Sequence, residues 1–387
     1  MKKIDMIIRN GQVFDSVNAK FEKKDIGIHQ GRFIALDEES EASNEVDAEG
    51  NYVVPGLIDE HAHLNLYGTI IGANADTVCI PNGITTACDG GTCGASNFEQ
   101  FYMSNIVRYE SAVYSYLNVS TFGNKSLCKH EEDHDPADFR EDLIDRLFEK
   151  YPQVLRGLKI RMCKGTLGNH GMSPLYAGLE MSGRLKEKGF HCPVAIHYDD
   201  LPENVTVHEL FGAMRKGDVI AHVFQTKAET IFDENGKIKD CVWEAKKRGV
   251  YMDDCHGRVH WSYPNLQNAF SQGFYPDIIS SDLVRISEYT RPGFSLLYAM
   301  SVNSAAGMPV EKILQSVTYT PAKVLGIEAK AGVIREGAPA DVTILDIRDV
   351  KDKIFTDNYG NSVSGNKLFV PLMTVRAGRT AYRQIFF

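Results

Sequence analysis

Two histidines separated by one residue, His61 and His63, follow the apolar run at residues 53–58. In a β-strand, residues two apart point to the same face, so the two imidazoles would lie side by side. Imidazole nitrogens are common ligands of zinc and similar divalent ions. The spacing therefore indicates a metal site at a strand end, although two unrelated strand-end histidines would show the same spacing.

Three more metal-binding side chains end apolar runs further along the chain. His197 ends the run 193–196, His222 ends the run 219–221, and Asp282 ends the run 278–281. In a barrel of parallel strands, the carboxyl ends of the strands meet at one mouth. The repeated occurrence of such endings favours one shared site more strongly than any of them does alone.

Lys159 is an unusual addition to this set. In the run 155–162, Lys159 and Arg161 share one strand face, and the apolar residues 158, 160 and 162 share the other. The apolar face should meet helices, which leaves Lys159 pointing into the barrel, where an unpaired ammonium beside metal ions is costly to bury. A lysine carboxylated by carbon dioxide is instead an anion that can bridge two cations. Lys164 is the alternative, but it falls on the opposite face or in the following loop, so we favour Lys159.

The elements that would position these residues follow a repeating pattern. Short apolar runs alternate with stretches of helical spacing, as in repeated strand and helix units. We predict an α/β fold with a (β/α)8 TIM barrel over residues 53–330; a doubly wound open sheet is the alternative. The eight expected strands lie near residues 53–58, 84–89, 113–119, 155–161, 193–197, 219–223, 250–254 and 278–282.

Both ends of the chain have the alternating pattern of β-strands, with turn signals such as Asn10-Gly11. We predict that residues 1–52 and 331–387 together form a small β-sandwich domain.

The composition indicates which kind of molecule the protein binds. The chain has 387 residues, with 42 basic and 51 acidic side chains and a net charge of -9. This balance favours a small-molecule substrate over nucleic acid or a membrane surface. The sequence has no membrane-spanning run and no signal-peptide core at its start, and its eight cysteines form no Cys-x-x-Cys pair, so we expect a cytoplasmic protein with reduced thiols. A homo-oligomer would be unsurprising.

The whole pattern resembles the amidohydrolase superfamily, and within it the dihydroorotase-like and deacetylase-like members that use two metals. The resemblance covers nearly the whole chain. It rests on Pro55–His63, Gly83–Thr86, Gly157–Arg161, His197, His222, Asp282, Thr320–Gly326 and Gly337–Val342.

The resemblance implies a ligand set and a reaction. His61, His63 and Asp282 would hold one divalent metal ion, His197 and His222 a second, and carboxylated Lys159 would bridge them. Zinc is the expected metal, with manganese or iron as alternatives. Asp282 would be catalytic, since it would take a proton from the attacking hydroxide and pass it to the leaving nitrogen.

The implied function is hydrolysis of the amide or ester bond of a small N-acyl or O-acyl compound, as in deacetylases. The alternatives are ring opening of a cyclic amide, as in dihydroorotase or hydantoinase, and deamination of a purine. A catalytically silent scaffold and an iron oxygenase with a single metal are further alternatives, and the complete set of ligand positions speaks against both.

The remaining polar residues are candidates for substrate contacts, for supporting contacts or for exposed loops. His256 follows the seventh expected strand and either contacts substrate or stabilises its loop. Arg291 either meets a substrate carboxylate or lies on the surface. His260 could pack at the barrel mouth. His130, His134 and His170 are expected as exposed loop histidines, and the acidic run 131–135 as a solvated loop. Nearby aspartates, at positions 89, 199, 200, 253 and 254, are expected to fix histidine tautomers.

Overall fold

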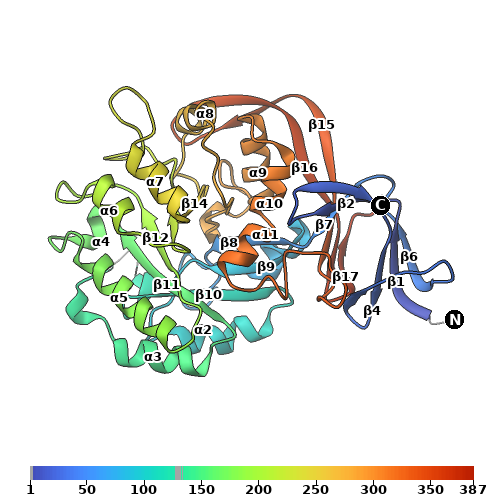
Figure 1. Cartoon of the computed structure of the whole chain (residues 1–387), viewed down its shortest axis with the longest axis horizontal. Helices are drawn as coiled ribbons and strands as arrows, with labels where there is room; N and C mark the ends of the chain where they lie inside the picture. Colours follow the sequence, from blue (N-terminus) through green and yellow to red (C-terminus); the bar gives the residue numbers. More distant parts are fainter. Residues whose placement is uncertain (1–2, 127–131, 133) are drawn as a thin grey trace.

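A parallel sheet forms the centre of the molecule in the computed structural model, which describes residues 3–126, 132 and 134–387 (Figure 1). Within these residues the sheet has seven strands, in the order β14-β13-β12-β11-β10-β9-β8. Apolar runs form its strands because both faces of such a sheet are buried. The strands are β8 (Leu57–Ala62), β9 (Ile84–Asp89), β10 (Ala112–Asn118), β11 (Leu155–Met162), β12 (Val194–Tyr198), β13 (Val219–Ala221) and β14 (Tyr251–Asp253).

An extended segment, residues 278–283, closes the sheet where we expected an eighth strand. Isolated parallel bridges join Asp253 to Ile278 at one edge and Ala62 to Leu283 at the other. The segment makes too few pairs with either edge to form a strand, and the backbone leaves the extended conformation at Asp282, where φ is 45°. The predicted barrel is confirmed, with a short closing segment in place of its last strand.

Helices cover the outside of the sheet (Figure 1). In α3, for example, Ile144, Leu147 and Phe148 are buried on one face of the helix. The helices are α1 (Ala75–Val78), α2 (Phe98–Ser104), α3 (Glu141–Lys150), α4 (Lys164–Leu167), α5 (Ser173–Glu187), α6 (Val207–Ala213), α7 (Asp240–Arg248), α8 (Tyr263–Ser271), α9 (Leu296–Ala305), α10 (Val310–Ser316) and α11 (Tyr319–Val324). None of the helices in the described residues has the length and apolar character needed to cross a membrane.

Strands from both ends of the chain build two further sheets, in the orders β5-β4-β1-β6 and β17-β16-β15-β7-β2-β3. Ile28 of the first sheet and Val53 and Ile344 of the second belong to one apolar core, so the two sheets pack together. The predicted domain boundaries stay a prediction. The strands are β1 (Lys3–Arg9), β2 (Gln12–Asp15), β3 (Lys20–Lys23), β4 (Ile26–His29), β5 (Arg32–Ile34), β6 (Glu41–Asp47), β7 (Tyr52–Pro55), β15 (Val342–Thr356), β16 (Ser362–Arg376) and β17 (Arg379–Arg383).

The predicted first strand, residues 53–58, is divided between two sheets. β7 pairs with β15 and β2 in the terminal sheet, whereas β8 starts the barrel at Leu57. The change occurs at Pro55-Gly56, because proline has no N–H for a ladder. Gly56 also lies so close to Thr85 that a Cβ would be 2.2 Å from the Thr85 Oγ1.

The hairpin of β15 and β16 reaches from the terminal sheet to the barrel, where it runs past α9 and α8 (Figure 1). At its turn, Tyr359 Oη donates to the Val259 carbonyl at 2.6 Å, and Asp357 Oδ2 accepts from the Tyr263 amide at 3.0 Å. The C-terminal part of the chain therefore holds the connection between β14 and α8.

Candidate metal centre

The end of β8 delivers His61 and His63 to the barrel mouth. Both side chains are buried, and their ring centroids lie 5.6 Å apart. Gly90, just after β9, leaves room for one of them, because a Cβ there would lie 2.2 Å from the His61 Cδ2. The strand geometry thus sets two imidazoles next to each other.

Asp282, in the closing segment, approaches these two histidines. Its Oδ1 lies 3.3 Å from His63 Nε2 and 3.7 Å from His61 Nε2. Its backbone amide donates to the His61 carbonyl at 2.8 Å. The positive φ of Asp282 is a strained conformation for a residue with a side chain, and such strain concentrates at functional sites.

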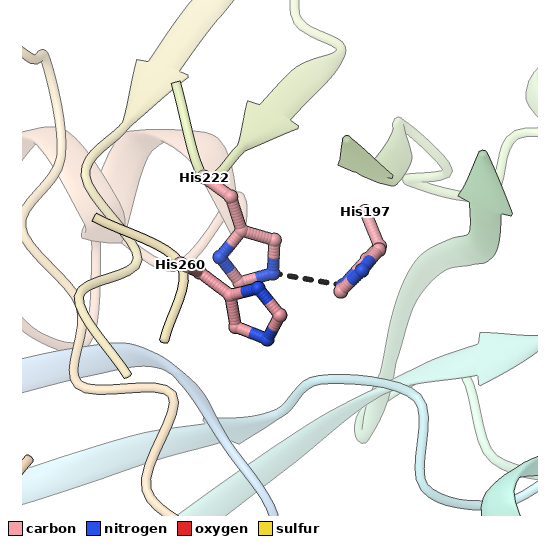
Figure 2. A group of neighbouring side chains, drawn as sticks. All are labelled: His197, His222 and His260. Atoms are coloured by element: carbon pink, nitrogen blue, oxygen red, sulfur yellow. Dashed lines mark hydrogen bonds between the residues drawn. The ribbon is translucent and has the colours of Figure 1, made fainter. Parts of the chain in front are cut away.

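His197, His222 and His260 form a second cluster, in which the three rings face one another (Figure 2). His197 lies in β12, His222 follows β13 with φ of 66°, and His260 comes from the loop between β14 and α8. His222 Nε2 is 2.9 Å from His197 Nδ1. The His260 ring centroid lies 4.2 Å from that of His222 and 5.0 Å from that of His197.

Hydrogen bonds determine which ring nitrogen of His63 and His222 is unprotonated. The Cys255 carbonyl can only accept, so His222 Nδ1 donates to it at 2.9 Å. Thr92 Oγ1 donates to Asp89 Oδ2 at 2.7 Å and so accepts from His63 Nδ1 at 2.8 Å. In the neutral rings, Nε2 is then unprotonated, which is the form that binds a metal ion.

Burial keeps the imidazoles of His61, His197 and His222 neutral. It lowers the pKa of His61 and His197 well below the usual value. It lowers the pKa of His222 to about 3. Burial alone would raise the pKa of Asp282, but His63 and the other imidazoles lower it well below its ordinary range. At neutral pH the site therefore offers the neutral imidazoles of His61, His197 and His222 and the carboxylate of Asp282.

Lys159 points into the same place from β11. It is 2% exposed, and its Nζ has no hydrogen-bond partner in the described part of the chain. Burial lowers the pKa of this amine. Gly91 packs against its stem, where a Cβ would lie 2.4 Å from the Lys159 Cβ. A buried amine without a partner is costly, so its environment favours a neutral or modified form over an ammonium.

These residues surround one cavity of about 100 Å³. It joins both clusters to Lys159 and includes two apolar and two further polar side chains. The lining residues are His61, His63, Ile71, Asn124, Lys159, Arg161, His197, His260, Asp282 and Val284.

Comparisons with known proteins agree with this arrangement. Residues 256–380 match the sequence model of the amidohydrolase family. The chain is 27% identical to a deacetylase of Enterococcus faecalis over 97% of this chain and 98% of that protein. It is 28% identical to a deacetylase of Brucella anthropi over 85% of this chain and 80% of that protein. A crystal structure of an adenine deaminase aligns with 99% of this chain and all of its own, with a TM-score of 0.89 and 26% identity.

The chain belongs to the amidohydrolase superfamily.

In this amidohydrolase, the six residues predicted as metal ligands lie around one site. His61, His63, Lys159, His197 and Asp282 line the cavity, and His222 lies within a 4.8 Å ligand grouping with Asp282. The buried histidine and aspartate clusters have the composition of a metal centre. The individual roles of these residues stay predictions.

His260 is the member of the site that the sequence did not single out. It lies within 4.8 Å of the donor atoms of His197 and His222, and its Nδ1 is 3.3 Å from Asp199 Oδ2. The predicted ligands other than Lys159 were selected because they end or follow an apolar run, and His260 lies inside a loop. The neighbouring Trp261 indicated that His260 could pack at the barrel mouth, but not that it could bind a metal ion.

The two predicted substrate contacts lie elsewhere in the amidohydrolase. His256 is fully buried and stacks on Trp261 with ring centroids 4.0 Å apart, which favours its loop-stabilising role. Arg291 is exposed and lines a separate cavity with Phe294 and Tyr298. Neither is among the residues that line the cavity of the metal centre.

The expectation of a solvated loop at 131–135 is wrong for two of its residues. Glu132 and His134 are buried, and the carboxylate of Glu132 accepts hydrogen bonds from His134 of the same loop and from two side chains outside it. The donors are Asn118 at 2.7 Å, His134 at 2.8 Å and Arg161 at 3.0 Å. His130 and residues 131 and 133 lie outside the described residues.

The structure agrees with the expectations for His170 and Lys164 and with part of that for the aspartates. His170 is exposed, and so is Lys164 at the start of α4, which leaves Lys159 as the lysine at the site. Among the aspartates expected to support histidines, Asp89 acts on His63 through Thr92, and Asp199 lies beside His260.

Proposed function

We propose that this amidohydrolase is a metal-dependent hydrolase that cleaves the amide or ester bond of a small N-acyl or O-acyl compound. The observation that carries the proposal is the meeting of two imidazole clusters at Asp282 and Lys159 around one small cavity. Full-length similarity to two deacetylases supports the acyl substrate class.

The residues present fit two divalent metal ions. His61, His63 and Asp282 would hold one, and His197 and His222 the other, with His260 as a further donor beside the second. The partnerless Nζ of Lys159 fits an N-carboxylated lysine, whose carbamate would join the two ions. Zinc suits imidazole and carboxylate donors, and manganese or iron would also be accepted. When bound, such ions supply hydroxide at neutral pH and polarise a carbonyl.

Asp282 is the residue that would move the proton. Its carboxylate is ionised at neutral pH because the surrounding imidazoles lower its pKa. It can therefore accept the proton of the attacking water on one of its oxygens and donate it to the departing nitrogen or oxygen. The strained backbone of Asp282 and its amide hydrogen bond to the His61 carbonyl keep its carboxylate beside the histidines.

The second candidate function is deamination of a purine-like ring. The adenine deaminase structure, with a TM-score of 0.89 and 26% identity, favours it. Deamination needs the same attacking water and the same proton transfer, so the metal centre itself does not separate the two reactions. Ring opening of a cyclic amide uses the same chemistry.

Metal analysis followed by a substrate panel tests the proposal. We expect about two metal ions per chain by elemental mass spectrometry, for protein grown with zinc or manganese and bicarbonate. The panel contains N-acyl and O-acyl compounds, adenine and cyclic amides. Turnover confined to acyl compounds supports the proposal, ammonia release from adenine supports deamination, and protein without bound metal indicates a silent scaffold.

A further inference from the structure

Arg161 is a charged wall residue of the cavity that the proposed hydrolysis does not use. It follows Lys159 by two residues on β11, so its side chain leaves the strand on the same face. It pairs in register with His197, and its side chain is 19% exposed. The guanidinium therefore lies beside the reacting centre and within reach of a bound small molecule.

One edge of this guanidinium is already paired. Nη1 donates to Glu132 Oε2 at 3.0 Å, and Glu132 is held in turn by Asn118 and His134. Within the described residues, Arg161 Nε and Nη2 have no hydrogen-bond partner. A guanidinium has five donors in a planar fork, so most of its donor capacity remains for a ligand.

The surroundings of Arg161 indicate which kind of ligand its guanidinium would bind. Cations proposed at the metal centre repel a guanidinium, and an anionic ligand between them relieves that repulsion. Arg pairs best with planar oxygen pairs such as a carboxylate. Ile71 and Val284 supply apolar contacts in the same cavity, whose volume of about 100 Å³ suits a small compound.

We infer that the substrate is an acyl compound that carries a carboxylate, that Arg161 binds this carboxylate, and that Glu132 is the positioning residue of Arg161. The inference rests on the proposed function, whose acyl substrate class it narrows. The competing explanation is an ion pair that only fastens the loop of Glu132 to β11. Loss of an ion pair with only that role would change kcat/KM equally for charged and neutral substrates.

Matched substrate pairs test the inference. The metal-loaded full-length protein is assayed with N-acetyl amino acids and O-acetyl hydroxy acids, each beside its primary amide. We expect kcat/KM for the acid to exceed that for the amide by about tenfold to a hundredfold, the value of a charge-assisted pair. Arg161→Met should remove this ratio, and Arg291→Met, in the other cavity, should keep it. Equal turnover of acid and amide by the wild type, or a ratio lost only in Arg291→Met, would overturn the inference.

A binding measurement keeps the test independent of turnover. The same acids should raise the melting temperature of the wild type more than their amides do, and Arg161→Met should abolish this difference. If no acid stabilises the wild type more than its amide does, the inference fails. The proposed function fails separately, when no acyl compound in the panel is turned over at all.

Glu132→Gln checks the positioning role. The amide side chain keeps the shape of the carboxylate but loses its charge, so the Arg161 fork is held less firmly. We expect KM for the acid to rise while kcat changes little, and the amide to be unaffected. A fall in kcat for both members of the pair would point to a merely structural ion pair.

Discussion

The two halves of the metal centre are held in different ways. The half with His61 and His63 comes from a single strand end of the barrel sheet, and Thr92 and Asp89 from the neighbouring strand end fix one ring. Nothing distant in the sequence is needed except the closing segment with Asp282. A short motif is therefore sufficient to encode the histidines of this half.

The half with His197, His222 and His260 depends on longer connections. His222 is fixed by the Cys255 carbonyl in the β14–α8 loop, which also carries His260. The turn of the β15–β16 hairpin holds this loop through Tyr359. The comparison teaches that one half is set by local strand geometry and the other by packing between the barrel and the C-terminal hairpin.

The largest effect is expected where the halves meet. Lys159→Ala removes the residue proposed to join them, so turnover should fall by more than the roughly 10²- to 10⁴-fold expected for a single acid-base group. The metal content should drop below two ions per chain, and short carboxylic acids should partly restore activity. Lys164→Ala, exposed on α4, is the control and should retain metal and turnover. Rescue seen in Lys164→Ala instead would reverse the assignment.

Asp282→Asn separates proton transfer from metal binding in the first half. Asn has nearly the same size but cannot hold the proton, so kcat should fall by about 10²- to 10⁴-fold. At least one metal ion should remain, measured by elemental mass spectrometry. Asp346→Asn, on β15, is the matched control. Retained turnover in Asp282→Asn would remove this residue from the mechanism.

The two halves also differ in how well the sequence predicts them. His61 and His197 lie one residue before the end of a strand, and His63 and His222 directly follow one, so the apolar runs predict their place at the barrel mouth. His260 has no such pattern, because its position depends on a loop held by a hairpin a hundred residues away.

Loops and closing segments are the parts that periodicity does not encode. Glu132 appears in the sequence as part of an acidic, solvated run, but in the structure it is buried and accepts a hydrogen bond from the partly exposed guanidinium of Arg161. The closing segment 278–283 has an apolar pattern like that of a strand, yet it makes only isolated bridges. For Glu132 a tertiary contact outweighs the local pattern, and in the closing segment the left-handed backbone at Asp282 ends the extended run.

Glu132→Gln should lower the free energy of unfolding at neutral pH and make it less dependent on pH in the acidic range. The substitution lies beside the second half of the metal centre, because Arg161 pairs in register with His197. Burial by itself would raise the pKa of Glu132. The hydrogen bonds and charges of His134 and Arg161 lower it by more, so the pKa falls from 4.5 to about 2. A lowered pKa gives stability that is present above pH 4.5 and lost as the pH falls towards 2. The contribution is about 3 kcal/mol in the free energy of unfolding.

Urea unfolding of wild type and variant across this range measures the effect. The wild type should have the larger free energy of unfolding near neutral pH. The difference in this free energy between wild type and variant should shrink steadily below pH 4.5. A gap that stays constant with pH would show that the ionised carboxylate is not its source.

His260→Ala tests whether the second half needs its loop histidine. We expect kcat/KM to fall by about tenfold to a hundredfold, the loss typical of a group that supports metal ligands. The metal ion of the first half should remain, because His61, His63 and Asp282 are unchanged. His170→Ala, an exposed histidine, serves as the control. Loss of both metal ions in His260→Ala would show that the halves are not independent.

Tyr359→Phe should have the smallest effect and acts on the second half alone. It deletes the hydrogen bond to the Val259 carbonyl, worth about 0.5–1.5 kcal/mol, so kcat/KM should fall only severalfold. Amide hydrogen exchange should become faster in residues 256–262 and stay unchanged in β8. Tyr289→Phe is the matched control, because Tyr289 Oη donates to the Thr77 carbonyl at 2.8 Å on a surface of similar exposure. Faster exchange in β8 as well would mean that the hairpin supports the whole mouth, and the contrast between the halves would then be one of degree.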